Sequence, residues 1–357
     1  MPEIPSNDRT AELQAELRAA LADNRPLAIR GGGSKAFYGR EVTGRPLGVS
    51  GHSGVVSYEP TELVVTVRAG TRLAELEALL AEHGQRLAFE PPHFGEGATV
   101  GGMVATGLAG PRRPWGGAVR DAVLGARILN GVGEELRFGG EVMKNVAGYD
   151  LSRLMVGSLG VLGVLLDVSL KVLPVPAART TRVLELGPGQ ALERLAEWGR
   201  QPLPITGAVH SGGRLHVRLA GNASAVAEAG ERIGGEELVD GGAFWADLRE
   251  QRLAFFTGET PLWRLSLPPA VMQPDLPGEW LIDWGGAQRW LRSDAWAGTI
   301  HAAAREAGGH AALFRGGDRG GEVFAPLSTP LLRVHRNLKR ALDPHGLFNP
   351  GRMYKEL

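Results

Sequence analysis

Residues 28–36 read AIRGGGSKA, so three consecutive glycines follow a short apolar run. This pattern predicts a strand at Leu27–Arg30 that runs into a tight loop. Because glycine lacks a Cβ atom, such a loop can present consecutive backbone N–H groups to an anion. A hydroxyl group and two positive charges flank the glycines. We therefore expect a phosphate site formed by Arg30, Gly31, Gly32, Gly33, Ser34 and Lys35.

Two other nucleotide-binding motifs fit this segment poorly. A P-loop requires Lys before Ser or Thr, whereas here Ser34 precedes Lys35. A Rossmann fingerprint matches Gly31, Gly33 and Ala36 by spacing, but that fingerprint must open a helix. Residues 37–46 have no amphipathic period and contain helix breakers. The sequence therefore predicts a phosphate site in a loop.

A second glycine-rich segment, residues 98–107, reads ATVGGMVATG and carries no charge. Its small residues and two threonine hydroxyl groups suit an uncharged heterocycle and a ribityl chain, with backbone N–H groups donating to ring acceptors. A plain buried turn is the alternative interpretation.

The composition limits the classes of function. Lys+Arg and Asp+Glu number 39 each, so bulk charge favours neither nucleic acid nor anionic lipid as a partner. No apolar run approaches 18 residues, and the N-terminus is polar and acidic, so we expect a cytoplasmic protein. Cysteine is absent, which excludes disulfides, a thiol nucleophile, a thiolate-ligated iron–sulfur cluster and a cysteinyl cofactor link. A bound organic cofactor must carry any electrons that the chain handles.

Periodicity and turn residues predict the remaining elements. A strand at 164–173 alternates as if half-buried, and Pro174 and Pro176 end it and mark a domain boundary near residue 176. Seven of the eight tryptophans follow that boundary, which indicates either core packing or a docking face for a partner. The other predicted helices are Thr10–Ala22, 72–83 (capped by Thr71 and ended by Gly84), 151–156, 223–232 and one opening near 328–330 with Leu331, Leu332 and Leu338 inside; the other strands are 55–58, 63–67, Val123–Leu129, 135–138 and 214–219.

Four further segments complete a recognisable order. They are WGGAVRDAVLG at 115–125, KNVAGYDL at 144–151, GSLGVLGV at 157–164 and DPHGLFNPG at 343–351. Together with the two glycine clusters, they resemble the vanillyl-alcohol-oxidase/D-lactate dehydrogenase family of FAD-binding flavoproteins. GGHAALFRGGD at 308–318 and NPGRMY at 349–354 are most similar to the smaller FAD-binding subunits of bacterial glycolate oxidases.

The resemblance implies an α+β fold and one non-covalently bound FAD. A two-lobed PCMH-type FAD-binding domain would span residues 1–176, an α+β cap domain 177–327, and a C-terminal segment, 328–357, would return to the FAD domain. The glycines at 31–33 would hold the pyrophosphate. Tyr149 would lie near the flavin, or would only fix its own turn. The other implied cofactor contacts are Pro91, Pro92, Thr99, Val100, Gly101 and Gly102 at the flavin and ribityl chain, Ala105, Thr106, Gly163 and Val164 through backbone near the adenosine and ring, and Asp121.

The catalytic residues are less well marked. Catalytic members of the family carry H-x-G-D-G-N-x-H in the substrate domain, whereas the corresponding stretch here, 310–319, has one histidine. No metal site is therefore expected. His310 could accept a hydroxyl proton and Arg315 could bind a carboxylate, although a structural role for both is the alternative.

The resemblance also implies the activity and the partners. We expect oxidation of a 2-hydroxy acid, glycolate, with hydride transfer to FAD and electron transfer to a larger FAD-binding subunit and an iron–sulfur subunit. The complex would lie at the cytoplasmic side of the inner membrane through those partners. Two alternatives stay open: a non-catalytic flavin-binding accessory subunit, and a self-sufficient FAD oxidoreductase with another substrate.

Overall fold

The computed structural model describes residues 4–140 and 150–357. The chain forms two compact units. Unit 1 comprises Met1–Leu108, Ala118–Pro174 and Pro326–Leu357, and unit 2 comprises Ala109–Gly117 and Val175–Ala325. The chain thus passes between the units within two residues of the predicted positions 176 and 327. The difference is the segment Ala109–Gly117, which the sequence placed in the first domain and which groups with unit 2.

Unit 1 begins with a small lobe that confirms two predicted elements. Helix α1 spans Thr10–Ala22, and strand β1 spans Leu27–Arg30. β1 pairs in parallel with β2 (Arg45–Gly48). Leu13 and Leu17 of α1 and Leu27 of β1 are fully buried. The side of α1 that carries Leu13 and Leu17 therefore faces the core.

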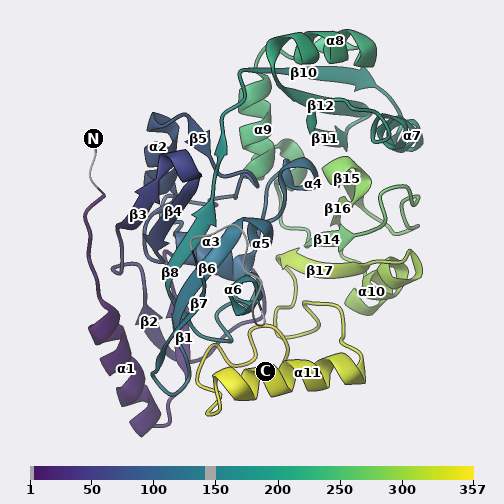
Figure 1. Cartoon of the computed structure of the whole chain (residues 1–357). Coiled ribbons are helices and arrows are strands. Elements are labelled where there is room, and N and C mark those ends of the chain that lie inside the picture. The colour runs from purple at the N-terminus through teal and green to yellow at the C-terminus, as the bar shows by residue number, and fades with distance from the viewer. Residues whose placement is uncertain (1–3, 141–149) are drawn as a thin grey trace. The chain divides into compact units, whose positions relative to one another are not determined.

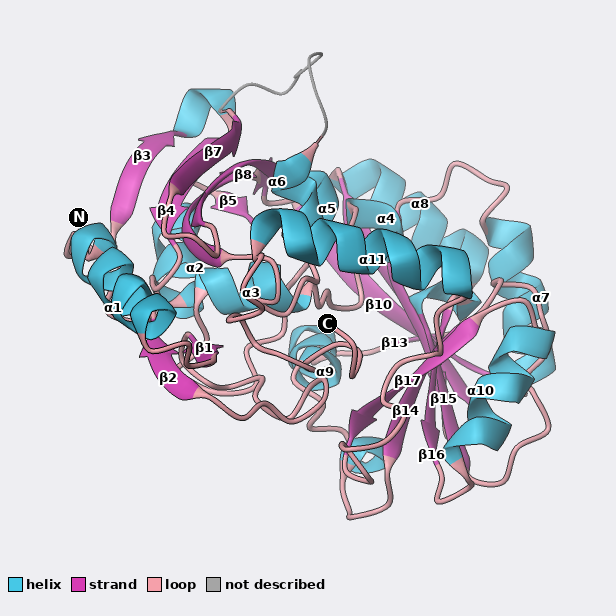
Figure 2. Cartoon of the chain, turned by 90° about the horizontal axis from the view of Figure 1, so that it is seen from below, coloured by secondary structure: helices cyan, strands magenta, loops and turns pink. Residues whose placement is uncertain are grey.

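The larger lobe of unit 1 is a five-stranded antiparallel sheet in the order β3-β4-β8-β6-β7. Figure 2 shows this curved layer with α2 and α3 on one side of it. The strands are β3 (Val55–Glu59), β4 (Val64–Arg68), β8 (Val164–Lys171), β6 (Val123–Leu129) and β7 (Glu135–Gly139).

Strand β8 corrects one prediction. The alternation at residues 164–173 indicated a half-buried strand, but β8 is central and both of its faces are buried. Its polar face is covered because Asp167 accepts a hydrogen bond from Arg127 Nε and lies 3.4 Å from the imidazole Nε2 of buried His52. Charge pairing therefore buries a face that the pattern assigned to solvent.

The helices of unit 1 are mostly short. They are α2 (Leu73–Glu82), α3 (Val100–Thr106), α5 (Val119–Ala122), α6 (Leu151–Leu154) and α11 (Thr329–Leu342). Thr71 does not cap α2 as predicted, because its hydroxyl group bonds with the backbone of Gly54. Leu331, which was predicted to lie inside α11, is 52% exposed. A two-stranded pair, β5 (Gln85–Arg86) with β9 (Leu173–Pro174), completes the unit.

Unit 2 is built on one eight-stranded sheet in the order β13-β10-β12-β11-β15-β16-β14-β17. Helices α8 and α9 lie on opposite sides of strands β10 and β12 (Figure 1). The strands are β10 (Ala178–Glu185), β11 (Ile205–Ser211), β12 (Arg214–Gly221), β13 (Glu236–Glu237), β14 (Leu262–Ser266), β15 (Glu279–Asp283), β16 (Gln288–Arg292) and β17 (His310–Arg315); the helices are α4 (Arg113–Gly116), α7 (Pro188–Trp198), α8 (Ala223–Ile233), α9 (Gly241–Arg249) and α10 (Ala297–Glu306).

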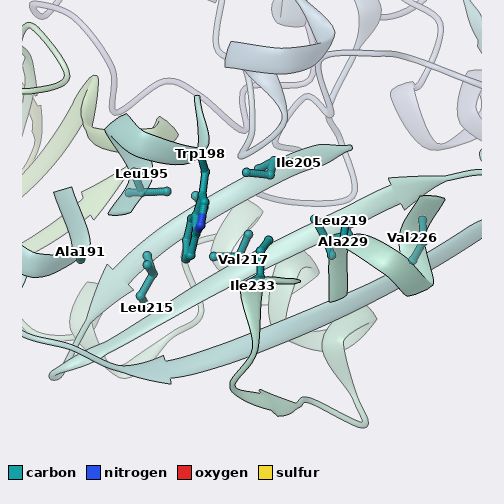
Figure 3. Close-up of a cluster of buried hydrophobic side chains, with 11 residues drawn as sticks. Ala191, Leu195, Trp198, Ile205, Leu215, Val217, Leu219, Val226, Ala229 and Ile233 are labelled. Atoms are coloured by element: carbon teal, nitrogen blue, oxygen red, sulfur yellow. The ribbon is translucent and has the colours of Figure 1, made fainter. Parts of the chain in front are cut away.

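Two apolar clusters stabilise unit 2. The first joins α7 and α8 to β11 and β12, with Trp198 packed among aliphatic side chains (Figure 3). The second joins α10 to β14, β16 and β17 around Trp263. Trp198, Trp245, Trp263 and Trp290 are all less than 10% exposed, so core packing accounts for these four tryptophans.

Candidate functional site

Two loops of unit 1 approach each other closely at the end of β1. A Cβ atom on Gly31 would lie 2.4 Å from Thr99 Oγ1, and one on Gly32 would lie 1.3 Å from the carbonyl oxygen of Gly97. No side chain fits in either place. The glycines at 31 and 32 are therefore required because the side chain of Thr99 and the backbone of Gly97, respectively, occupy the space of a side chain.

The next residue, Gly33, is a glycine for another reason. Its φ is +75°, and an added Cβ would meet nothing within 4 Å. Among the described residues, no hydrogen bond uses the backbone N–H of Gly31, Gly32, Gly33 or Ser34. Four successive N–H donors with no partner in the described part of the chain form the arrangement that binds phosphate oxygens.

The facing loop, residues 90–97, contacts the buried ammonium group of Lys35 and carries backbone strain. Lys35 is 7% exposed, and its Nζ donates to the carbonyl of His93 at 3.1 Å and lies 5.9 Å from the centroid of the Phe94 ring. Glu90 and Phe94 adopt positive φ values of 47° and 53°. Non-glycine residues in this region cost about 1–3 kcal/mol each and gather at functional sites. Of this loop, the sequence predicted only Pro91 and Pro92 as cofactor contacts.

Residues 99–102 differ from the prediction in their backbone bonding. Thr99 caps α3 by accepting from the N–H of Gly102 at 3.2 Å. The N–H of Val100 donates to Thr71, and that of Gly101 donates to Ala69. The N–H groups of Val100, Gly101 and Gly102 are engaged inside the protein, so these three do not serve as the predicted backbone donors to a ligand.

The segment 157–163 lies against the end of α3. The N–H of Leu159 donates to the carbonyl of Ala105 at 2.8 Å, and Thr106 Oγ1 donates back to Gly102 at 2.8 Å. Gly163 packs tightly beside Leu129, and Val164 begins β8 fully buried. Sequence analysis missed Ser158, which is 4% exposed and whose Oγ has no partner among the described residues. An unpaired buried hydroxyl group is costly unless a ligand or water completes it.

The remaining predicted cofactor contacts lie at the edge of this region or outside it. Asp121 Oδ2 accepts from the N–H of Ala118 at 2.8 Å, so it fixes the start of α5. Pro91 and Pro92 are buried in the loop that leads to α3, and Arg30 is exposed at the end of β1. Tyr149 lies outside the described residues.

In unit 2, the two predicted catalytic residues lie at opposite ends of β17. His310 begins the strand opposite Ser266, and Arg315 ends it, where its Nη2 donates to Gln251 Oε1 at 2.9 Å. They are five residue steps apart along the strand, or roughly 16 Å. Arg264 of β14 pairs with Ala312 and is therefore a diagonal neighbour of His310, at about 7 Å. Desolvation on the strand, followed by the charge of Arg264, lowers the pKa of His310, so its imidazole is neutral near pH 7.

Among residues 4–140 and 150–357, no group of three or more His, Cys, Asp or Glu side chains could hold a metal ion. In the same part of the chain, no helix is both long enough and apolar enough to cross a membrane.

Comparison with known proteins supports the geometry. Residues 7–139 match a family model described as an FAD binding domain. The glycolate oxidase subunit GlcE of Escherichia coli (strain K12) is 57% identical over 350 residues, which is 98% of this chain and 99% of that protein. A D-lactate dehydrogenase of Archaeoglobus fulgidus is 30% identical over 66% of this chain and 50% of its own length. The glycolate oxidase subunit GlcD of Bacillus subtilis (strain 168) is 29% identical over 51% and 39%.

A solved structure of alkyldihydroxyacetonephosphate synthase has the same fold. Its TM-score is 0.67 at 16% identity, over 95% of this chain and 74% of that one. The predicted α+β fold with a PCMH-type FAD-binding domain is confirmed, and so is FAD as the cofactor. The chain belongs to the family of the glycolate oxidase subunit GlcE, whose members are FAD-binding oxidoreductases related to the D-lactate dehydrogenases.

Proposed function

We propose that the paired glycine loops of unit 1 hold the pyrophosphate of FAD, and that the chain is the FAD-binding subunit of a complex that oxidises glycolate or a related 2-hydroxy acid. The observation that carries the placement of the cofactor is the run of unengaged N–H groups at Gly31, Gly32, Gly33 and Ser34 beside buried Lys35. Charge-assisted hydrogen bonds from such donors are about twice as strong as neutral ones.

The rest of the cofactor follows from this placement. The flavin and ribityl chain would contact Pro91, Pro92 and residues 99–102 through surface rather than through the N–H groups of Val100 and Gly101. The unpaired hydroxyl group of Ser158 is a further candidate contact, beside the proposed backbone contacts of Ala105, Thr106, Gly163 and Val164. Asp121 would act indirectly, by fixing the start of α5.

The chemistry that bound FAD would supply is acceptance of a hydride from the substrate carbon that carries the hydroxyl group. The neutral imidazole of His310 can accept the hydroxyl proton. Arg264 can bind the substrate carboxylate through two parallel N–H donors, and it lies nearer to His310 than Arg315 does. We therefore assign to Arg264 the carboxylate-binding role that was predicted for Arg315.

The test uses the complex purified with its native partners and kept without oxygen. We expect glycolate to bleach the flavin absorbance in wild type, and His310→Gln to slow bleaching at least tenfold. Arg264→Met should raise the KM for glycolate far more than Arg315→Met does. Equal bleaching rates in wild type and His310→Gln would refute the assignment of the proton acceptor.

A second candidate function is a non-catalytic flavin subunit. It is favoured by the separation of His310 from Arg315 and by the engagement of Arg315 with Gln251. In that case neither His310→Gln nor Arg264→Met changes the turnover of the complex, while removal of the flavin from this chain still does.

We further propose the partners and the location. The chain would assemble with a larger FAD-binding subunit and an iron–sulfur subunit, on the cytoplasmic side of the inner membrane. The similarity of the chain to proteins named as glycolate oxidase subunits supports this assembly. Co-purification with a tagged chain, followed by counting of flavin and iron, tests it.

A further inference from the structure

The C-terminal segment 343–352, which is part of unit 1, contacts the residues on both sides of the glycine loop. It bonds with β1, which precedes the loop, and with residues 36–40, which follow it. We propose that Asn349 and Arg352 are positioning residues, which hold the glycine loop in the geometry that receives the pyrophosphate of FAD. This inference rests on the proposed placement of the cofactor.

Asn349 connects β1 to the segment 157–163. Its side chain is 6% exposed, and its backbone adopts a φ of 40°. Oδ1 accepts from the N–H of Ile29 at 2.7 Å, and Nδ2 donates to the carbonyl of Leu159 at 2.7 Å. Its own N–H donates to Leu27 at 3.0 Å. The side chain thus takes the place of a neighbouring strand at Ile29, two residues before the first glycine.

The same asparagine links the glycine loop to the second glycine segment. Leu159, which Asn349 Nδ2 holds, donates its N–H to Ala105 at the end of α3. One amide therefore joins β1, the segment 157–163 and α3. Loss of the amide frees the entry to the loop from both neighbours at once.

Arg352 holds the exit from the loop. Its Nη2 donates to the carbonyl of Ala36 at 3.1 Å and also to that of Tyr38, and its Nη1 donates to that of Arg40 at 3.0 Å. In the opposite direction, Arg40 Nε donates to the carbonyl of Gly351 at 3.1 Å. A planar guanidinium spreads its donors over separate nitrogens and so reaches three carbonyls along one turn, whereas the donors of a lysine ammonium all lie on one nitrogen.

Asn349 and Arg352 matter because the glycine loop has few interactions of its own that would order it. Three consecutive glycines lose more conformational freedom on ordering than any other residues would. The N–H groups of residues 31–34 make no bond inside the described protein, so they do not order the loop. A loop that is ordered before FAD binds avoids that entropic cost at binding.

The experiment measures the affinity of the chain for FAD and the thermal stability of the FAD-free chain separately. The variants are Asn349→Ala, Arg352→Ala and the conservative Arg352→Lys, with Arg340→Ala as the matched control, because Arg340 is exposed on α11. We expect the FAD dissociation constant to rise at least tenfold, or about 1.4 kcal/mol, in the two alanine variants. Arg352→Lys should be intermediate and Arg340→Ala should match wild type.

A merely structural role would lower the melting temperature of the FAD-free chain and leave the affinity of the remaining folded protein unchanged. That result, measured well below the transition, would overturn the proposal. If Asn349→Ala fails to fold, Arg352→Lys and Arg352→Ala still decide the question. Gly32→Val separates this proposal from the placement of the cofactor. Full FAD affinity in Gly32→Val would refute the placement itself. Lost FAD affinity in Gly32→Val, together with normal affinity in Asn349→Ala and Arg352→Ala, would refute only the positioning role of Asn349 and Arg352.

Discussion

Single glycines at the phosphate loop differ in why they are needed, and this difference can be tested. In Gly32→Val, the side chain would meet the backbone of Gly97, so the loops must separate. Losing even two charge-assisted hydrogen bonds at about 1.5–3 kcal/mol each weakens FAD binding a hundredfold or more. Equilibrium dialysis of the apoprotein with FAD measures the effect.

The matched control is Gly48→Val on the adjacent strand β2, where an added Cβ meets nothing within 4 Å. It should retain FAD affinity, since valine suits a strand. Gly33→Ala should have a smaller effect than Gly32→Val, because it brings backbone strain at φ +75° without a clash. Normal affinity in Gly32→Val would place the pyrophosphate elsewhere.

Asp283, at the end of β15, makes the stability of unit 2 depend on pH. Its burial raises its pKa to about 7, against the pull of hydrogen bonds from the N–H of Trp284 and from Gln288 Nε2. Between about pH 4 and pH 7 the unfolded carboxyl group is ionised while the folded one keeps its proton, so stability falls as the pH rises through this window.

Asp283→Asn should therefore make the stability of unit 2 depend less on pH, and it should raise the melting temperature at pH 8. Each unit of pKa difference corresponds to about 1.4 kcal/mol. Thermal unfolding of unit 2 at pH 5 and pH 8 measures the effect, and Asp275→Asn at an exposed position is the control. A steeper pH dependence in Asp283→Asn than in wild type would contradict the assignment.

The sequence could predict the glycine loop but not the residues that face it. Glycines at 31–33 after a strand imply close approach or positive φ, and both occur. That Gly97 supplies the close approach depends on a contact 65 positions away, for which no local pattern gives a signal. Ser158 and Asn349 were visible only as members of motifs, because their roles come from burial and from bonds to distant carbonyls.

At the scale of elements, helix α11 is attached to unit 1 by a buried ion pair. Lys339 Nζ donates to Asp343 Oδ2 at 2.7 Å and to the carbonyls of Val161 and Phe348 at 2.8 Å each. Asp343 also accepts the N–H groups of Leu347 and Phe348. Removing one member of a buried pair leaves an uncompensated charge, which costs about 3–5 kcal/mol.

We therefore expect Lys339→Met to destabilise unit 1 by about 3 kcal/mol, since two backbone N–H groups still hold Asp343. Chemical denaturation, with hydrogen exchange at residues 343–349 to locate the loss, measures it. Arg340→Met is the control on the same turn. The double variant Lys339→Met/Asp343→Leu should recover part of the loss, and a double variant as unstable as the sum of both single variants would show that the pair is not coupled.

Elements with a clear period were the predictable ones. The predicted bounds of α1, β6 and β7 agree with the structure to within a residue. Strand β8 and residue Leu331 of α11 were misjudged, because the charges that cover Asp167 and the exposure of Leu331 are decided by tertiary packing. The local sequence pattern indicates which side chains alternate, but it does not indicate what packs against them.

At the scale of the whole molecule, the division into units shows the limit of proline signals. Pro174 and Pro176 lie where the chain leaves unit 1, but Pro111 and Pro114, inside the excursion at Ala109–Gly117, did not predict a boundary there. Its attachment within unit 2 comes from Trp284 Nε1, which donates to Gly110, and from Arg113, 4.6 Å from the Trp284 ring centroid. Both contacts join residues about 170 positions apart, beyond the reach of sequence periodicity.

The whole chain should hold its FAD without a covalent bond. It has no cysteine, and residues 31–35 of the phosphate loop contain no histidine to form a histidyl link. Acid precipitation of the holoprotein should release a yellow supernatant and leave a colourless pellet. Flavin fluorescence that stays with the denatured chain on a gel would contradict this prediction.

The chain by itself should bind FAD but should not sustain glycolate oxidation with its natural acceptor. Without a single cysteine it cannot ligate a thiolate-bound iron–sulfur cluster that would carry electrons onward. The separation of His310 from Arg315 also leaves its own substrate contacts incomplete unless Arg264 supplies the missing cation. The measurement compares the chain, reconstituted with FAD, with the co-purified complex under anaerobic conditions. We expect glycolate and D-lactate to bleach flavin in the complex at least a hundredfold faster than in the chain alone. Equal rates, with turnover of the isolated chain on an artificial acceptor, would instead identify a self-sufficient oxidoreductase.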